Sequence, residues 1–450
     1  MPGQHLSCAC DDFRTSSAAT RKRFVGESQL TRRQLIGWGA AAGLSLYSMR
    51  ALPITDVLQA AAADAAAAPN APVLVAVFLP GGLDLLDTLI PSDYGRYAAL
   101  HPSVRVKTPM SLNGTAVQIH PGMSQGLGGG IRGLYGAGQV AFLPGIDYPD
   151  PNLSHFHSRH FWETGVISDN AGPGWLGRWL DLHGNADNPL QGLSLSYDLS
   201  PVLRSRTAPV ASASAPGNSG FYIRDVYGEP FDAAMATYTA LAKAGGGGPG
   251  LRAAKRNAKL AKLVGDLLNP YGEVNGVDPL ASPVPYPANN DFGDRLRSVA
   301  GLIAAPLGIR VATVDAPGDF DTHSNQVATL GTDLPLISQA LSAFQADLQA
   351  RGVADRVLTL VWSEFGRRPQ DNASGTDHGA GGVAWIQGPQ VNSGFLSAYP
   401  DLNAFDDDDN LKVTMDFRTV YSSLIEQWLG TDAGAVIPGA GGVGRIKVVR

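Results

Sequence analysis

Residues 355–388 read DRVLTLVWSEFGRRPQDNASGTDHGAGGVAWIQG, and this stretch indicates how the rest of the chain is arranged. Its first part, 357–362, is a short and nearly unbroken apolar run with β-branched and aromatic members. Such a run is typical of a strand that is buried on both faces of a parallel sheet. A glycine-rich loop follows it, and the apolar residues after the loop predict a second strand. We therefore predict an α/β fold around a mostly parallel sheet.

Polar side chains follow the first of these strands. Glu364 lies where the strand ends, and Gly366 lets the chain turn away. In α/β proteins, ligands bind at the carboxyl ends of parallel strands, so Glu364 is a candidate site residue. Asp377 and His378 stand between glycines in GTDHG, which leaves room for both to approach a metal or a substrate. The alternative is a solvated loop that carries one histidine.

Two other predicted strands end in the same way. Residues 73–79 (VLVAVFL) are followed by a Gly-Gly turn and Asp84, which could be a metal ligand or a helix cap. Residues 309–314 are followed by Asp321 and His323, whose spacing in a loop lets a carboxylate and an imidazole turn toward one ion. An apolar stripe from Leu334 to Leu348 then predicts a helix that stops at Gly352. Strand, loop, helix and strand make a parallel crossover, so these loops should share one sheet edge.

A further buried strand at 140–143 leads into residues 148–165, YPDPNLSHFHSRHFWETG. Here Ser154 should begin a helix that ends before Gly165. The unpaired N–H groups and partial positive charge of a helix N-terminus suit a nucleophile that faces an anion. The clustering of His155 with two more histidines also favours chemistry at this point. The alternative is that Ser154 is only an N-cap.

The N-terminal part resembles an export signal. Arg32 and Arg33 stand directly before an apolar run of about fifteen residues, which is short of the roughly 20 needed to span a bilayer. We expect a twin-arginine signal and Ala-rich linker at 1–68, no permanent membrane span, and a periplasmic or extracellular protein. The main domain should then occupy 69–450. Low-complexity segments predict a flexible insertion or cap at about 185–300.

Composition narrows the chemistry. The chain has 450 residues, of which 44% are hydrophobic and 16% charged, so it should be globular. Cys8 and Cys10 both precede the domain, so its metal ligands, if any, should be oxygen and nitrogen atoms. Without residues 1–68 the chain keeps 27 basic and 35 acidic residues, a formal charge of −8. That charge argues against a nucleic-acid partner.

With these motifs in place, the chain resembles the DUF1501 family, exported proteins of the alkaline-phosphatase-like superfamily. The resemblance runs from about residue 73 to 430 and implies a three-layer α/β/α sandwich. It departs from the superfamily where Ser363 and Glu364 stand in place of the usual Asp-His, and where Asp321 and His323 are only two residues apart. The motifs that carry it are FLPGGLDLLDTLIP, PNLSHFHSRHFWETG, GWLGRWLD, FDTHSNQ, SEFGRRPQDN and GTDHG.

The resemblance implies an exported, metal-dependent hydrolase of phosphate or sulfate esters, acting on a small or polymer-borne anionic ester. Its ions would be divalent: Zn, Mg, Mn or Ca. The alternative is a non-catalytic envelope protein that keeps the fold and binds a polymer or protein partner. A metal-free serine hydrolase is disfavoured because no predicted buried strand leads into a GxSxG nucleophile elbow. The implied roles are Ser154 as nucleophile; His155, Arg367 and Arg368 in substrate binding; and Asp84, Asp321, His323, Glu364 and His378 as metal ligands.

The twin-arginine assignment predicts an export defect. Changing Arg32 and Arg33 to Lys should leave the precursor in the cytoplasm, because the twin-arginine translocase would no longer recognise the signal. Cell fractionation and immunoblotting measure this. Normal levels of processed protein outside the cytoplasm would contradict the assignment.

Overall fold

The computed structural model describes residues 61–62, 66, 68–170, 172–218 and 263–450, with a few residues between 228 and 260. The twin-arginine stretch, both cysteines and much of the expected insertion lie outside the described residues. What we expect of those segments therefore stays a prediction.

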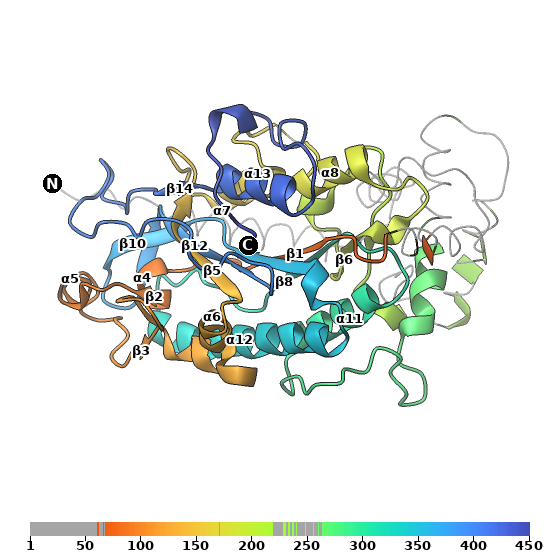
Figure 1. The fold of residues 1–450 in the computed structure, drawn as a ribbon, viewed down its shortest axis with the longest axis horizontal. Coiled ribbons are helices and arrows are strands. Elements are labelled where there is room, and N and C mark those ends of the chain that lie inside the picture. Colours follow the sequence, from red (N-terminus) through yellow and green to blue (C-terminus); the bar gives the residue numbers. More distant parts are fainter. Residues whose placement is uncertain are drawn as a thin grey trace.

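A mixed sheet, mostly parallel, forms the centre of the molecule (Figure 1). Its strands are β1 (Val73–Phe78), β5 (Val140–Asp147), β6 (Gly192–Ser194), β7 (Ala211–Ser212), β8 (Val311–Asp315), β9 (Val357–Trp362), β12 (Gly382–Gln387), β13 (Gly394–Phe395) and β14 (Met415–Asp416). In the described part of the chain they lie in the order β13-β5-β12-β9-β1-β8-β6-β7, with β14 beside β5. Only β12 runs antiparallel to its neighbours β5 and β9. The five strands predicted from apolar residues are thus confirmed as β1, β5, β8, β9 and β12.

The central strands are buried on both faces, as the unbroken apolar runs predicted. In β1, Val73, Val75 and Val77 point into one hydrophobic core. Leu74 and the other alternate residues point into a second core on the opposite face. Since successive strand side chains alternate between faces, only a run that is apolar throughout can fill both cores. β9 has the same property, with Leu360 on the second face.

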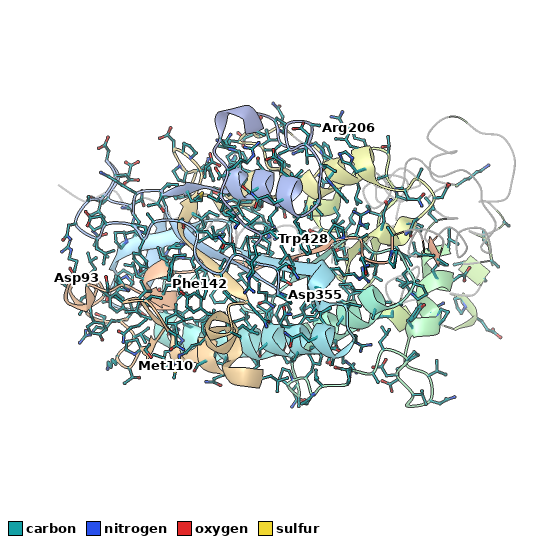
Figure 2. All side chains as sticks on the ribbon, viewed as in Figure 1. Asp93, Met110, Phe142, Arg206, Asp355 and Trp428 are labelled. Atoms are coloured by element: carbon teal, nitrogen blue, oxygen red, sulfur yellow. The ribbon has the colours of Figure 1, made fainter. Side chains whose placement is uncertain are left out.

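Helices cover both faces of the sheet and complete the three-layer sandwich (Figure 1). The first face carries α6 (Gly130–Gly136), α11 (Asp291–Ala304) and α12 (Gln326–Ala350); the second carries α7 (His155–Thr164), α8 (Trp175–His183) and α13 (Phe417–Gln427). Phe142 of β5, labelled in Figure 2, lies between the sheet and the helices of the first face. Its ring stacks on Tyr135 of α6, with ring centroids 5.5 Å apart. Past the end of α13, the Nε1 of Trp428 donates a hydrogen bond to the Val73 carbonyl at 3.0 Å (Figure 2). Among the described residues, no helix has the length and apolarity to cross a membrane.

The topology brings three strand ends to one edge. β8, α12 and β9 follow one another in the chain, and β1 lies between the two strands and pairs in parallel with both. The segments after β1, β8 and β9 therefore leave the sheet together, as the predicted crossover requires. α12 begins at Gln326, two turns before the apolar stripe that predicted it, and it includes Pro335.

The segment predicted as a glycine-rich loop after β9 is in part a hairpin. β10 (Gly366–Asp371) pairs antiparallel with β11 (Thr376–Gly379), and Arg367 lies opposite His378. A Cβ at Gly379 would lie 2.4 Å from the Arg368 nitrogen, so the hairpin needs glycine there. The polar sequence GRRPQD concealed β10, because it carries no strand-like alternation of apolar residues.

Shorter elements complete the described chain. β6, β7 and most of α11 come from the stretch predicted as an insertion (185–300), so part of that stretch belongs to the sheet and the core. The remaining helices and strands are α4 (Leu85–Thr88), β2 (Leu89–Ile90), α5 (Tyr94–Leu100), β3 (Met110–Ser111) and β4 (Gln118–Ile119), the last two joining β2 in a small sheet.

The two-sided burial of β9 predicts a large cost for truncating it. Leu360→Ala should lower the free energy of unfolding by about 2–5 kcal/mol, because it leaves a cavity between the sheet and the second helical layer. Urea unfolding measures this. Leu182→Ala is the matched control: Leu182 is 54% exposed on α8, so the same substitution should change stability by no more than about 0.5 kcal/mol. Equal losses in the two variants would contradict the assignment of β9 to the core.

Candidate functional site

A glycine turn after β1 holds the carboxylate of Glu364. The Gly81 nitrogen donates to Glu364 Oε1 at 2.9 Å, and the Gly82 nitrogen donates to Oε2 at 3.3 Å. Both glycines have positive φ, 107° and 80°, which aims successive N–H groups at one anion. A Cβ at Gly81 would also lie 2.3 Å from the Asp321 nitrogen. Glycine at this position therefore brings the segments after β1, β8 and β9 into contact.

Ser363 fixes the same junction from the end of β9. Its Oγ accepts hydrogen bonds from the nitrogens of Gly82 and Leu83, both at 3.1 Å, and donates to the Leu79 carbonyl at 2.7 Å. Ser363 is 4% exposed. Its hydroxyl is thus used to hold the turn after β1.

His155, the first residue of α7, connects two carboxylates. Its Nδ1 lies 2.8 Å from Glu364 Oε1, and its Nε2 lies 3.5 Å from Asp321 Oδ2. Its ring also packs against Phe365, with centroids 4.8 Å apart. The start of α7 is therefore anchored at the carboxyl edge of the sheet.

Two more imidazoles reach Asp321 from other elements. His378 of β11 places Nε2 at 2.9 Å from Asp321 Oδ1, and its Nδ1 lies 2.8 Å from the Leu153 carbonyl. His323 places Nε2 at 3.1 Å from the same Oδ1, and its Nδ1 lies 2.7 Å from Asp377. Asp321 is thus the centre of a group of three histidines.

Arg367 of β10 also binds Asp321, the residue at the centre of this group. Its guanidinium is fully buried and donates to Asp321 Oδ1 at 2.8 Å. The other bonds of this side chain go to the carbonyls of Gly82 at 2.9 Å, Thr376 at 3.0 Å, Phe320 at 2.8 Å, and Gly81. The expected role in substrate binding is corrected here, since the donors of Arg367 are committed to the protein itself. Arg368 is next in the strand and binds the Asp408 carbonyl with Nη1 at 2.8 Å.

The charges of the group are strongly coupled. Burial alone would raise the pKa of Asp321, but hydrogen bonds from the three histidines and the charge of Arg367 outweigh it and hold the pKa well below its usual value. Burial would lower the pKa of His155, yet Asp321 and Glu364 raise it to about 9. His323 also has a raised pKa, mainly through its bond with Asp321. Burial keeps the pKa of His378 below its usual value.

The group has donors that suit a divalent metal ion. The ligand atoms of His155, Asp321 and His378 all lie within 4.8 Å of one another. Imidazole nitrogen and carboxylate oxygen are the usual ligands of Zn²⁺ in sites without cysteine. His323 and Glu364 contact this triad, so four of the five predicted ligands are in or next to it: Asp321, His378, His323 and Glu364.

Asp84 does not join them. Its Oδ1 accepts from the nitrogens of Leu86 and Asp87 and so caps α4, the alternative that the sequence left open. Its Oδ2 accepts from Gln326 at 2.9 Å and from Thr376 at 3.1 Å. Because it lies in a separate buried group with Asp87 and His101, the structure corrects the expectation that all five ligands meet in one place.

Ser154 holds the position predicted for it. It is the N-cap residue of α7 and is half-buried, but its side chain makes no capping hydrogen bond. On either side of it, Leu153 contacts His378 and His155 contacts Glu364 and Asp321. The hydroxyl is thus not used for capping and belongs to a backbone segment that is pinned to the histidine group.

Sequence reasoning missed several contributors. Gln326 bridges Asp84 and Asp87 through its amide, at 2.9 and 2.7 Å, although it stands outside any apolar pattern. Asp377 is predicted only to have room to approach a metal or a substrate, and in the structure it orients His323. The pairing of His101 with Asp87 at 2.9 Å joins side chains fourteen residues apart, and no local motif indicates it.

Residues 144–425 match the family model described as "Protein of unknown function (DUF1501)", which is more than half of the chain, so this protein belongs to the DUF1501 family. The matched range contains Ser154, Asp321, Glu364 and His378. The glycine turn after β1 precedes it. Among curated proteins, none matches this chain.

Solved structures of low sequence identity resemble the chain. One from Bacteroides thetaiotaomicron VPI-5482, described as a sulfatase, is 8% identical with a TM-score of 0.28, covering 72% of this chain and 66% of that one. A 2-O GAG sulfatase is 9% identical with a TM-score of 0.29, covering 72% and 65%. The alkaline phosphatase from the Antarctic bacterium TAB5 is 10% identical with a TM-score of 0.28, covering 71% and 91%. The chain thus spans slightly less than two thirds of the length of the two sulfatases.

The buried pair of His101 and Asp87 predicts a pH dependence of stability. Burial by itself would lower the pKa of His101, but Asp87 and Asp84 raise it to about 9, above the value of about 6.5 in an unfolded chain. The pair should therefore stabilise the folded protein fully below about pH 6.5. This stabilisation should be lost as the pH rises through about 9, which changes the free energy of unfolding by a few kcal/mol at most.

Urea unfolding at pH 6 and pH 10 measures this contribution. The loss of stability between the two pH values should be smaller in His101→Gln than in the natural protein. His183→Gln is the matched control, because His183 is exposed on α8. An unchanged pH difference in His101→Gln would contradict the assigned protonation.

Proposed function

We propose that this protein is an exported, metal-dependent hydrolase of phosphate or sulfate esters that uses Ser154 as its nucleophile. The observation that carries the proposal is the convergence of His155, Asp321 and His378 directly beside the N-terminus of α7. This position is the carboxyl edge of a parallel sheet, where α/β proteins bind ligands. The N-terminus of a helix additionally favours an anionic group.

A divalent ion would be held by these three side chains. When bound, it would supply positive charge that lowers the pKa of a serine hydroxyl and balances the charge of the transferring group. The fit rests on the donor types and on their separations, with a distance of 3.5 Å between His155 Nε2 and Asp321 Oδ2. The candidate ions are Zn, Mn, Mg and Ca, and the two imidazole nitrogens favour Zn among them.

The reaction would proceed in two displacements. The Ser154 hydroxyl releases its proton to solvent and its oxygen attacks the phosphorus or sulfur atom. As the new bond forms, the bond to the leaving oxygen breaks, and the alcohol leaves with a proton from solvent. Water then attacks the same atom, breaks its bond to Ser154, and restores the hydroxyl while phosphate or sulfate leaves. His323 would help to neutralise the anion, since its bond with Asp321 raises its pKa.

The same geometry has a feature that favours the non-catalytic alternative. Glu364, Asp321 and Arg367 satisfy one another and nearby backbone groups, so the group can hold the sheet edge together on its own. A protein that keeps this edge only as a scaffold would bind a polymer or protein partner at the envelope. Turnover measurements separate the two functions.

The proposed function also specifies the substrate class and the compartment. The substrate would be a small or polymer-borne anionic ester, met in the periplasm or outside the cell after export by the twin-arginine translocase. The net charge expected of the exported part, −8, makes a nucleic-acid substrate unfavourable.

The nucleophile assignment predicts the effect of Ser154→Ala. Turnover of an aryl phosphate or aryl sulfate by the metal-loaded protein should fall by several orders of magnitude, because no oxygen remains to form the covalent ester. Metal content should stay the same. Since the side chain makes no capping bond, stability should change by no more than about 0.5 kcal/mol.

Steady-state kinetics and a thermal melt test this prediction. Ser393→Ala, at an exposed serine, is the matched control and should leave the turnover rate and the melting temperature unchanged. Retained turnover in Ser154→Ala would remove Ser154 from the mechanism and indicate water as the attacking group. A melting point lowered by an amount that corresponds to about 1 kcal/mol would instead assign it to helix capping.

A further inference from the structure

We infer that the site binds one metal ion, through Nε2 of His155, Nε2 of His378 and the carboxylate of Asp321, and that the guanidinium of Arg367 stands in place of a second ion. This inference rests on the metal dependence in the proposed function and goes further, by fixing the number of ions and the role of each surrounding side chain. It assigns Glu364 to positioning His155 rather than to binding metal.

The histidines are oriented as metal ligands are. His155 is held through Nδ1 by Glu364 at 2.8 Å, and His378 is held through Nδ1 by the Leu153 carbonyl at 2.8 Å. Metal-binding histidines usually have their other ring nitrogen fixed by a carboxylate or carbonyl in this way. His323, held by Asp377 at 2.7 Å, follows the same pattern beside the triad. In each of the three rings, Nε2 is the other nitrogen, and it faces Asp321.

The separations suit one ion of low coordination number. His378 Nε2 lies 2.9 Å from Asp321 Oδ1, and His155 Nε2 lies 3.5 Å from Oδ2. Ligands that are each about 2.0–2.2 Å from a tetrahedral Zn²⁺ lie roughly 3.3–3.5 Å apart, so small shifts would suffice. The triad would leave a fourth position for substrate or water, as catalytic zinc sites do.

Glu364 has no capacity left for a metal ion. Its Oε1 interacts with the Gly81 nitrogen and with His155, at 2.9 and 2.8 Å. Its Oε2 accepts from the Gly82 nitrogen at 3.3 Å and from the Gly81 nitrogen at 3.2 Å. A carboxylate offers about four lone-pair sites, so these contacts saturate it.

Asp84 is unavailable for the same reason. Its two oxygens accept four bonds, from two backbone nitrogens of α4 and from the side chains of Gln326 and Thr376. It is 2% exposed and grouped with Asp87 and His101, apart from the triad. A second ion that used Asp84 or Glu364 would have to break several buried hydrogen bonds.

Arg367 supplies the charge that a second ion would otherwise bring. Its Nη2 lies 2.8 Å from Asp321 Oδ1, and its remaining bonds to backbone carbonyls hold it in place. A second divalent ion on this side of Asp321 would meet a fixed positive charge at close range, which is strongly unfavourable in a buried site. Asp321 thus shares its charge between Arg367 and one ion.

Metal stoichiometry and affinity test this arrangement. The full exported chain, stripped with chelator and checked for folding by circular dichroism, is titrated with Zn²⁺ by calorimetry, and its metal content is measured by elemental analysis. We expect one equivalent of Zn²⁺ per chain. Glu364→Gln should keep one equivalent but bind it roughly 10–100-fold more weakly, because His155 loses its orienting partner. His378→Asn should lose more affinity than that.

Asp84→Asn is the matched control, a carboxylate-to-amide change outside the triad, and it should leave stoichiometry and affinity unchanged. Two equivalents in the natural protein would overturn the inference, as would loss of an equivalent in Asp84→Asn or Glu364→Gln. Those results would leave the proposed hydrolase function standing. One equivalent without turnover of any phosphate or sulfate ester would overturn the hydrolase function and keep the one-ion site. Absence of Zn²⁺ binding in the folded chain would overturn both.

Discussion

The carboxyl edge of the sheet depends on one buried cation. Arg367 is surrounded by the carbonyls of the turn after β1, the segment after β8 and the hairpin after β9, and by the carboxylate of Asp321. A buried guanidinium is expensive to desolvate unless all its donors are bonded, so these segments cannot rearrange independently. The glycines at 81 and 82 allow the approach, since their carbonyls face Arg367 while their nitrogens face Glu364. Arg367 thereby fixes the position of Asp321, which the three histidines contact.

Much of the fold could be predicted from the sequence, because two-sided burial requires unbroken apolar runs. Residues 357–362 gave the bounds of β9 correctly for this reason. The sequence does not predict the first two turns of α12 or the strand β10, because neither segment has a periodic apolar pattern. Tertiary contacts stabilise both of them. Gln326 begins α12 as a buried amide that binds Asp84 and Asp87, and β10 is held by its pairing with β11. A polar segment that is ordered by long-range hydrogen bonds has no local pattern to read.

The candidate site could also be predicted only in part from the sequence. The strand-end rule predicted that Asp321 and Glu364 lie at one edge, and the structure brings His378 and the start of α7 to the same place. What the sequence could not show is how each lone pair is used. Glu364 faces backbone nitrogens because two glycines upstream adopt positive φ, and Asp84 turns toward the first turn of α4 and Gln326. The contacts of Glu364 with Gly81 and of Asp84 with Gln326 join residues more than two hundred positions apart in the chain.

That separation in sequence has a consequence for folding. The bond from the Gly81 nitrogen to Glu364 closes a loop of 283 residues, and the contact of His378 with Leu153 closes one of 225. Contacts of such high order form late and slowly, because the entropy of closing the loop must be lost before they can stabilise the chain. In a nascent chain, neither of these two contacts can form before both of its partners have been synthesised. If this protein leaves the cytoplasm already folded, its slowest folding step would decide when export can begin.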